Sequence, residues 1–379
     1  MKPLEGLVVL EFSQFMSGPV AGLRLADLGA RVIKIERPDC GEGGRNIDIK
    51  DLYIGDDSLV FHTINRNKES YTADLKNAKD KENVVRLIKQ ADVMTHNFRP
   101  GVMKRFDLDY NSVKEINPRI IYGVITGFGK KGPWSSKPGQ DLLVQSMSGL
   151  TYLSGDKEDP PTPFGLAAAD IICGGQLVQG ILAALIRRSK TNEGALVELS
   201  LLESLLDLQF EVLTTHLNDG GKLPERAKHG NAHAYLRAPY GVYKTKDGFI
   251  VIAMENIHNL GDILKFDKLY KYEKHEWFSK KDEIQSELAS LLKTKSTDHW
   301  LSMMKSEDIW CAEVFDYQKL LDHNGFEALQ MSQEVETTEG ETIKTTRCPI
   351  RIDGKRLFNS KAAPKVGEDK RKVTEDFNL

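Results

Sequence analysis

The N-terminal third of the chain alternates short apolar runs with helical stretches, and this pattern constrains the fold more than any other feature. Leu7–Phe12 is a mostly apolar run, and Arg31–Glu36 (RVIKIE) is a second one. Between them a loop at 13–18 precedes Pro19, which is favoured at the start of a helix, and Gly29 is a typical helix stop. Two parallel strands joined by a helix form a βαβ unit, which can hold a nucleotide at the strand ends.

The same alternation continues to about residue 200 and predicts the class of the fold. We expect strands at 92–95, 119–125 and 196–199, and helices at 82–90, 141–147 and 170–188. A further helix follows the last of these strands and ends at about residue 217. A loop rich in Gly, Lys, Pro and Ser runs from 127 to 139. Strands that alternate with helices in this way predict an α/β domain with a largely parallel sheet.

The composition changes after residue 217, and the chain length of 379 residues suits two domains. We expect the first part of a large domain at 1–217 and a linker at 218–229 (NDGGKLPERAKH). A smaller α+β domain follows at 230–325, with a hairpin of strands 240–245 and 249–253 whose turn places Gly248 at positive φ, and with helices around 282–305. Residues 326–379 hold a second hairpin candidate and a lysine-rich tail.

Charge and cysteine content exclude several classes of protein. The 52 basic and 55 acidic residues give a net charge of −3 and a pI near 6.3, which argues against a broad nucleic-acid-binding face. Four scattered cysteines suggest neither a disulfide framework nor a metal site. The longest apolar runs, 181–186 and 249–254, are far shorter than the ~18 residues of a membrane span. With no signal-peptide pattern, a cytoplasmic protein is expected, with neither membrane nor nucleic acid as a partner.

Basic and amide side chains recur just after the predicted strands, where α/β proteins bind ligands. They form clusters at Arg37 and Arg45 around a glycine-rich loop, at 65–68 (NRNK), at Leu75-Lys76 and at 97–101 (NFRPG). Solvated surface charge is the alternative reading of each cluster alone. Together they suggest an anionic ligand that carries phosphates and a planar base, although no GxGxxG fingerprint of a dinucleotide is present.

Two aspartates stand at the starts of apolar helices. Asp141 follows the glycine-rich loop, and Asp170 follows GLAAA. Asp is a preferred helix N-cap, so capping is the simplest interpretation of both. A carboxylate in small, apolar surroundings at a helix N-terminus is also a good nucleophile. Gly174 and Gly175 would let a bulky ligand approach the second helix.

These segments together resemble the family III CoA-transferases, which include formyl-CoA:oxalate, carnitine and bile-acid CoA-transferases and α-methylacyl-CoA racemase. The resemblance lies in LEGLVVLEFSQFMSGPVAGLRLADLGARVIKIERP, NRNKESYTADLK, ADVMTHNFRPGVMKRFDLDY, INPRIIYGVITGFGKKGP, GQDLLVQSMSGL and GLAAAD. It is dense over residues 3–200 and looser beyond them.

This resemblance implies a Rossmann-like large domain completed by the C-terminus, a smaller α+β domain, and an interlocked, ring-like homodimer. It implies that coenzyme A binds at positions that match the family motif, with no metal. These positions are Arg37, Leu75, Lys76, Asn97, Phe98 and Arg105.

The resemblance also implies that the substrates are an acyl-CoA and a small carboxylate. Asp170 matches the nucleophilic aspartate, which forms a mixed anhydride with the donor acyl group and then an aspartyl-CoA thioester. Asp141 matches an auxiliary acidic residue, to which we assign an orienting or electrostatic role.

Three departures from the family pattern bear on specificity. The racemase branch carries a histidine base directly before the position of Asp141, where this chain has Gln140, which cannot act as a base near neutral pH. Met16 replaces a glutamine of the oxalate-using enzyme, and HAYLRAP (233–239) replaces its tetraglycine loop. The 233–239 loop either covers the site or is ordinary surface. Racemisation and CoA binding without turnover remain the alternative functions, and the sequence leaves the donor and the acceptor open.

Overall fold

The computed structural model describes residues 2–379 and divides the chain into two compact units. The first unit contains the residues up to Val144, Ala167–Leu208 and Ala328–Leu379, and the second contains Gln145–Leu166 and Gln209–Glu327. This division differs from the boundaries that composition suggested, because 145–166 and 209–229 belong to the second unit instead of a large domain and a linker. Its first boundary falls inside a helix, which no change in composition marks.

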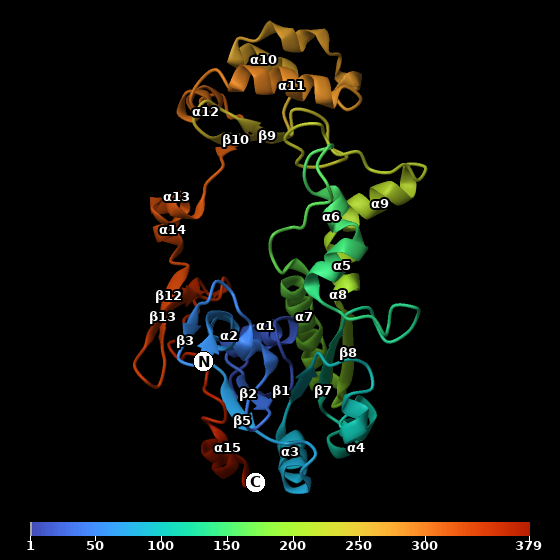
Figure 1. Cartoon of the computed structure of the whole chain (residues 1–379), viewed down its shortest axis with the longest axis vertical. Helices are drawn as coiled ribbons and strands as arrows, with labels where there is room; N and C mark the ends of the chain where they lie inside the picture. The colour runs from blue at the N-terminus through green and yellow to red at the C-terminus, as the bar shows by residue number, and fades with distance from the viewer. Residues whose placement is uncertain (1) are drawn as a thin grey trace. The chain divides into compact units, whose positions relative to one another are not determined.

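A parallel sheet of six strands forms the centre of the first unit (Figure 1), and it confirms the predicted α/β class with a parallel sheet. The order is β5-β2-β1-β6-β7-β8, and every neighbouring pair is parallel. The strands are Val8–Glu11 (β1), Arg31–Glu36 (β2), Glu69–Thr72 (β5), Val93–His96 (β6), Ile121–Thr126 (β7) and Ala195–Ser200 (β8). The chain order reverses between β1 and β6, so a crevice is expected at their carboxyl ends.

Helices cover both faces of this sheet. They are Ser17–Asp27 (α1), Leu59–Asn65 (α2), Ala78–Gln90 (α3), Tyr110–Ile116 (α4), Ala168–Thr191 (α7) and Leu201–Leu208 (α8). By length and composition alone, α7 could cross a membrane, and the core helix of a folded domain meets the same two criteria. Here α7 packs against α1, α8, β7 and β8.

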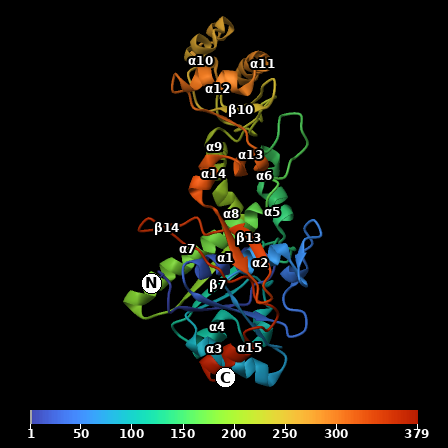
Figure 2. The ribbon, with the colours of Figure 1, turned by 90° about the vertical axis from the view of Figure 1, so that its left-hand side faces the viewer.

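The C-terminus returns to the first unit and adds to its core. Helix α15, at Lys370–Phe377, contacts β5 and α3, and Figure 2 shows it beside α3. Val373 and Phe377 are buried in the cluster that also contains residues of α3 and of the central strands. The carboxylate of Asp369 accepts a hydrogen bond from the Ser70 amide, at 2.9 Å, and so ties the tail to β5.

The second unit has its own antiparallel sheet and core. Strands Gly241–Lys244 (β9), Phe249–Ile252 (β10) and Cys311–Glu313 (β11) pack with Ile257–Leu264 (α10), Lys281–Leu292 (α11) and Thr297–Lys305 (α12). The predicted hairpin is present, but Gly248 does not have a positive φ. The Thr245 hydroxyl closes the turn instead, by accepting from the Gly248 amide at 3.0 Å.

The remaining elements are short. They are Tyr53–Ile54 (β3), Asp57–Ser58 (β4), Asp141–Ser148 (α5), Leu150–Leu153 (α6), Phe210–Asn218 (α9), Tyr317–Leu321 (α13), Asn324–Leu329 (α14), Ser332–Glu336 (β12), Thr342–Thr346 (β13), Arg351–Ile352 (β14) and Lys355–Arg356 (β15). Strands β12 and β13 confirm the second hairpin. The helix expected to reach residue 217 is two helices, α8 and α9, with Gln209 between them.

Three basic residues that we read as ligand contacts are structural. Arg45 is buried and pairs with Glu36 at 2.7 Å, and Arg66 is buried against Asp27. Lys68 is fully buried and pairs with Glu11 at 2.9 Å. A buried charge needs a partner of opposite sign. Asp27 and Glu11 lie 39 and 57 residues before Arg66 and Lys68, so local composition could not reveal these two pairs.

Candidate functional site

A cavity of about 460 Å³ lies at the carboxyl ends of β1 and β6, at the point where the strand order reverses. Its wall comes from the β1–α1 loop, the segment after β6, the glycine-rich loop after β7, and the first turns of four helices, α1, α5, α7 and α8. The lining residues include Gln14, Phe15, Met16, Ser17, Asn97, Phe98, Arg99, Lys137, Gln140, Asp141 and Asp170. The structure therefore brings together five of the site residues predicted from sequence: Asp170, Asp141, Gln140, Asn97 and Phe98.

The β1–α1 loop is held rigidly by groups on several elements. Lys34 donates to the Ser13 carbonyl and Lys68 donates to the Pro19 carbonyl, each at 2.9 Å. The Phe15 amide donates to the Glu42 carboxylate at 2.9 Å, and Phe15 has a φ of +62°. A non-glycine residue pays of order 1 kcal/mol for such a backbone, which persists only where its surroundings enforce it. The loop thus presents the N-terminus of α1 to the cavity in one conformation.

Asp170 is the third residue of α7, and its carboxylate lies against the N-terminus of α1. It accepts hydrogen bonds from the Ser17 hydroxyl and from the Ser17 backbone amide. Burial and, to a lesser degree, the charge of Asp141 raise the pKa of Asp170 to about 6, against the opposing effect of the two bonds from Ser17. The carboxylate is desolvated yet still ionised at neutral pH, which suits a nucleophile.

Asp141 and Gln140 have separate structural roles. Asp141 is the first residue of α5, it is 7% exposed, and its Oδ2 accepts from the Asp170 amide at 3.1 Å. Gln140 is exposed, and its Oε1 accepts from the Leu142 amide at 3.1 Å. Gln140 therefore caps α5, and Asp141 caps the first turn of α7. The interpretation of Asp170 as an N-cap is wrong, because it is the third residue of α7 and its carboxylate bonds to the start of α1. The interpretation of Asp141 as an N-cap of α5 stays a prediction.

Glycines set the distance between the helices around this site. A Cβ on Gly174 would lie 2.6 Å from the Ser17 carbonyl oxygen, so this glycine lets α7 meet α1 and does not admit a ligand as we expected. A Cβ on Gly175 would have no neighbour within 4 Å. In the loop after β7, Gly127 and Gly139 lie backbone to backbone, since a Cβ on either would fall within 2.5 Å of the other's Cα. That contact closes the loop and brings Asp141 to the cavity.

Four of the predicted coenzyme A positions lie outside the cavity lining. Arg37 follows β2, Leu75 and Lys76 follow β5, and Arg105 is in the turn after β6. Arg37, Lys76 and Arg105 are exposed, and Leu75 is half-buried against the main core. Because β5, β2, β1 and β6 are neighbours and parallel, these positions share the carboxyl edge of the sheet with the cavity.

Asn97 and Phe98 lie inside the cavity with different roles. Asn97 accepts from the Gln14 amide at 2.8 Å and donates to the Gln14 carbonyl at 2.7 Å and to Ser17 Oγ at 3.3 Å. Its side chain therefore holds the β1–α1 loop. Phe98 stacks on His96 with the ring centres 5.9 Å apart. Burial lowers the pKa of His96 to about 4, so this ring is neutral at physiological pH.

Two further cations line the cavity, and only one of them, Arg99, lies in a cluster that the sequence analysis read as a ligand contact. Arg99 follows Phe98, and Lys137 lies in the glycine-rich loop. Both side chains are exposed, and neither forms an ion pair with another residue in the range 2–379. The sequence carried a signal for both, an arginine in NFRPG and a lysine between glycines. Ser17 was also missed, because its role depends on contacts that no local pattern reveals.

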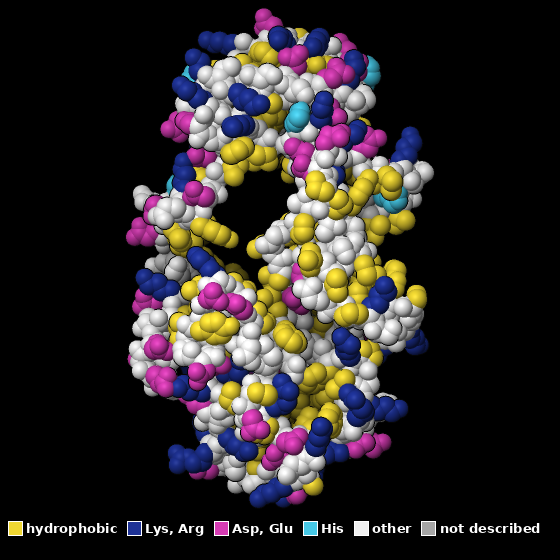
Figure 3. Space-filling view, in the orientation of Figure 1, with side chains coloured by type: hydrophobic (Ala, Val, Ile, Leu, Met, Phe, Trp, Pro, Cys, Tyr) yellow, Lys and Arg dark blue, Asp and Glu magenta, His cyan; other side chains and the backbone are white. Residues whose placement is uncertain are grey.

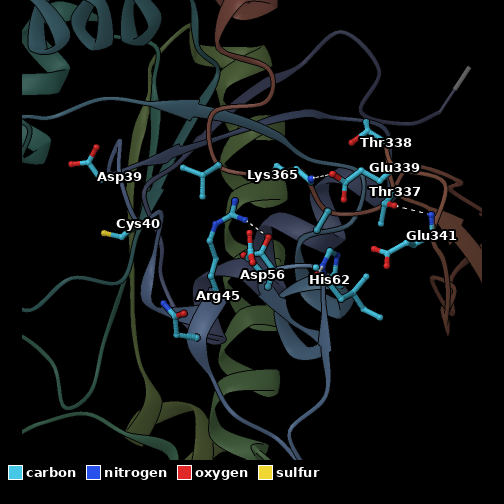
Figure 4. Close-up of a pocket in the computed structure, with 16 residues that line it drawn as sticks. Asp39, Cys40, Arg45, Asp56, His62, Thr337, Thr338, Glu339, Glu341 and Lys365 are labelled. Carbon is cyan, nitrogen blue, oxygen red and sulfur yellow. Dashed lines mark hydrogen bonds and ion pairs between the residues drawn. The ribbon is translucent and has the colours of Figure 1, made fainter.

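A second cavity in the first unit, of about 450 Å³, has an acidic lining (Figure 4). Its two cations, Arg45 and Lys365, are both paired with carboxylates. Five carboxylates line it, those of Asp39, Asp56, Asp57, Glu339 and Glu341. A ligand with several phosphates would be repelled there, so the cavity at Asp170 is the better site for an anion.

The 233–239 loop belongs to the second unit. The His233 ring lies 3.1 Å from a Glu211 carboxylate oxygen, and Arg237 stacks over the Trp277 ring at 5.0 Å. Both contacts are made within that unit. That the loop covers the site stays a prediction.

A profile described as CoA-transferase family III matches residues 4–370. The chain belongs to this family. It is 34% identical to acetyl-CoA:oxalate CoA-transferase of Acetobacter aceti over 83% of this chain and 81% of that protein. It is 31% identical to succinate–glutarate CoA-transferase of Agrobacterium fabrum over 98% of this chain and 94% of that protein. The crystal structure of a CAIB/BAIF family protein from Brucella suis superposes with a TM-score of 0.85 at 30% identity, covering 99% of both chains.

Membership confirms the resemblance seen in the sequence, and it confirms the expectation of a CoA-transferase. Family III enzymes use CoA thioesters as substrates. The relatives named above act, by their names, on oxalate, succinate and glutarate.

Proposed function

We propose that this enzyme moves coenzyme A from an acyl-CoA to a short dicarboxylic acid, through covalent intermediates on Asp170. The observation that carries the proposal is the Asp170 carboxylate itself, half-buried in a cavity and held by two donors from Ser17. The names of the relatives, which pair CoA with oxalate, succinate and glutarate, support a dicarboxylate as the acceptor.

The residues of the cavity fit coenzyme A. Arg99 and Lys137 offer exposed positive charge at the cavity, and Arg37, Lys76 and Arg105 offer it along the same edge of the sheet. Cations of this kind complement phosphates. The exposed part of Phe98 supplies an aromatic face beside them.

In the proposed reaction, Asp170 attacks the acyl carbon of the donor thioester and forms a mixed anhydride, and the CoA thiolate leaves. The thiolate then attacks the aspartyl carbonyl, so that Asp170 becomes an aspartyl-CoA thioester and the donor acid departs. The acceptor carboxylate reverses both steps. Each intermediate is sensitive to hydrolysis, so the site has to exclude water while it is occupied.

A Rossmann-like first unit and a homodimer are parts of the same proposal. The strand order, with its reversal between β1 and β6, supports the first. The homodimer is supported by helix α9, which has no buried residue. Its large hydrophobic side chains, those of Phe210, Leu213 and Leu217, are 66%, 36% and 72% exposed. Figure 3 shows hydrophobic side chains gathered over the segment of α6 and α9. A partner subunit would cover such a face. The cytoplasmic location remains a prediction.

Trapping the intermediate tests this function directly. Incubation with an acyl-CoA and hydroxylamine is expected to leave a hydroxamate on Asp170, located by peptide mass spectrometry. Asp170→Asn should abolish both the trap and the transfer of CoA to glutarate or oxalate. Asp207→Asn, a change at an exposed carboxylate of the same unit, is the matched control and should retain both. Full transfer activity in Asp170→Asn would refute the mechanism.

Two alternative functions, racemisation and CoA binding without turnover, can be distinguished from CoA transfer by assays on the same wild-type protein. A racemase needs a base, and among the described residues no histidine lines this cavity, while Gln140 takes the place of the family's histidine. Deuterium entry from D₂O at the α-carbon of a 2-methylacyl-CoA, without any acceptor acid, would favour racemisation. Binding of CoA with no exchange of labelled acid into any acyl-CoA would favour a protein without turnover.

A further inference from the structure

Ser17 lies where it can act on the reacting carboxylate, and neither the family motif nor the sequence pattern assigns it a role. It is the first residue of α1 and is 4% exposed. Gly174, one helical turn after Asp170 on the same face of α7, has its Cα against the Ser17 carbonyl. Ser17 therefore packs on the face of α7 that carries Asp170, and its amide and hydroxyl both reach that carboxylate.

The direction of the Ser17 hydroxyl is fixed by its second neighbour. Asn97 Nδ2 donates to Ser17 Oγ at 3.3 Å, and the orientation of this amide is set because its Oδ1 accepts from the Gln14 amide. A hydroxyl that accepts from Asn97 has its proton free for another acceptor. The Asp170 carboxylate is the acceptor that lies beside it.

We propose that the Ser17 hydroxyl, oriented by Asn97, is a catalytic donor that stabilises the oxyanion formed on the Asp170 carboxyl group during CoA transfer. This inference rests on the proposed function and deepens it. One carboxylate oxygen attacks the donor, and the other, held by Ser17, becomes the carbonyl oxygen of the anhydride.

When the CoA thiolate attacks that carbonyl carbon, a C–S bond forms and the π electrons move to the held oxygen. Collapse of the oxyanion breaks the bond between the aspartyl carbon and the bridging oxygen of the anhydride. That oxygen leaves with the donor acyl group as a carboxylate, so no proton is consumed. A fixed donor at the position where the charge develops is worth roughly 10²- to 10³-fold in kcat.

Ser17→Ala removes the hydroxyl and keeps the backbone amide. We expect kcat for CoA transfer to fall roughly 10²-fold with KM nearly unchanged, since the bond strengthens in the transition state. Because a hydrogen bond to the ionised form lowers a carboxyl pKa, the acid limb of kcat/KM should also move to higher pH. A purely structural role would not produce that shift.

Ser13→Ala is the matched control. Ser13 belongs to the same loop and is 1% exposed, and its hydroxyl has no hydrogen-bond partner among residues 2–379. It should leave kcat and the pH profile unchanged. Asn97→Asp adds a test of the orienting contact, because an aspartate would accept the Ser17 proton and turn it away from Asp170. Asn97 is thus a positioning residue, and Asn97→Asp should cost little further kcat in a Ser17→Ala background.

The outcomes separate this inference from the proposed function. Unchanged kcat and pH profile in Ser17→Ala, with a hydroxamate still trapped on Asp170, would overturn the role of Ser17 and leave the function standing. If the wild type transfers no CoA, a ¹³C NMR titration of Asp170, assigned with Asp170→Asn, reads the contact without any turnover. A higher pKa of Asp170 in Ser17→Ala than in Ser13→Ala supports the contact, and equal values overturn it.

Discussion

The charge of Asp141 controls the pH range in which Asp170 is a nucleophile, and a single isosteric change tests this. Burial and the negative charge of Asp141 together raise the pKa of Asp170 from 3.8 to about 6. With a pKa of about 6, roughly ten in eleven molecules are ionised at pH 7 and one in eleven at pH 5, so kcat/KM should fall about tenfold between them. Asp141→Asn removes the charge and keeps an oxygen that can accept from the Asp170 amide.

The expected result is an acid limb that moves below pH 6 in Asp141→Asn, because a like charge no longer opposes ionisation of Asp170. Burial remains, so the limb should stay above the ordinary value of 3.8. The rate at about pH 8 should fall modestly, since a less basic carboxylate is a weaker nucleophile.

The assay is kcat/KM for the acyl-CoA donor, measured from about pH 4.5 to 8.5 in wild type, Asp141→Asn and the control Asp207→Asn. The titrating groups of the substrates are common to all three proteins, so the difference between the profiles reports on Asp170. An acid limb that stays in place or moves upward in Asp141→Asn would contradict the reasoning.

Two further predictions concern stability. In denaturant unfolding, Gly174→Ala should destabilise the protein by roughly 1–3 kcal/mol, because its Cβ would lie 2.6 Å from the Ser17 carbonyl oxygen, and it should also lower CoA transfer. The control Gly175→Ala, whose Cβ has no neighbour within 4 Å, should be neutral or stabilising by up to about 1 kcal/mol. Asp170→Asn should stabilise the fold by up to about 3 kcal/mol above pH 6, because a raised folded-state pKa costs stability there, and this gain should vanish as the pH falls to about 4. A gain that is independent of pH would contradict the assignment of the raised pKa to Asp170.

The strands that the sequence predicted well are those whose own side chains are apolar. The run RIIYGVI at 119–125 overlaps β7, because a parallel sheet covered on both faces needs near-continuous apolar runs. Strand β5 (ESYT) was missed, since its polar residues are buried by partners remote in sequence. The Ser70 hydroxyl donates to Glu36 at 2.7 Å, and Glu69 pairs with Lys372 on the C-terminal helix.

The same limit explains which charges were misread. Arg37 and Arg66 look alike in the sequence, each a basic residue in or beside a strand-end loop. In the structure Arg37 is exposed, whereas Arg66 is 1% exposed and bonded to Asp27, 39 residues away in the chain. Whether a cation serves a ligand or the core depends on that non-local partner, which composition does not record.

The sequence by itself determined the α/β class, the family, and the aspartate on which the proposed chemistry rests. Those properties follow from local patterns: apolar periodicity, helix starts, and ordered motifs in the first 200 residues. Only the tertiary structure decided what surrounds Asp170, because its environment is built from the starts of three helices that are far apart in the chain. Ser17, Asp141 and Asp170 meet at one cavity because β1, β6 and β7 are neighbours in the sheet and α7 packs against α1. These contacts set the charge, the burial and the hydrogen bonds of the carboxylate.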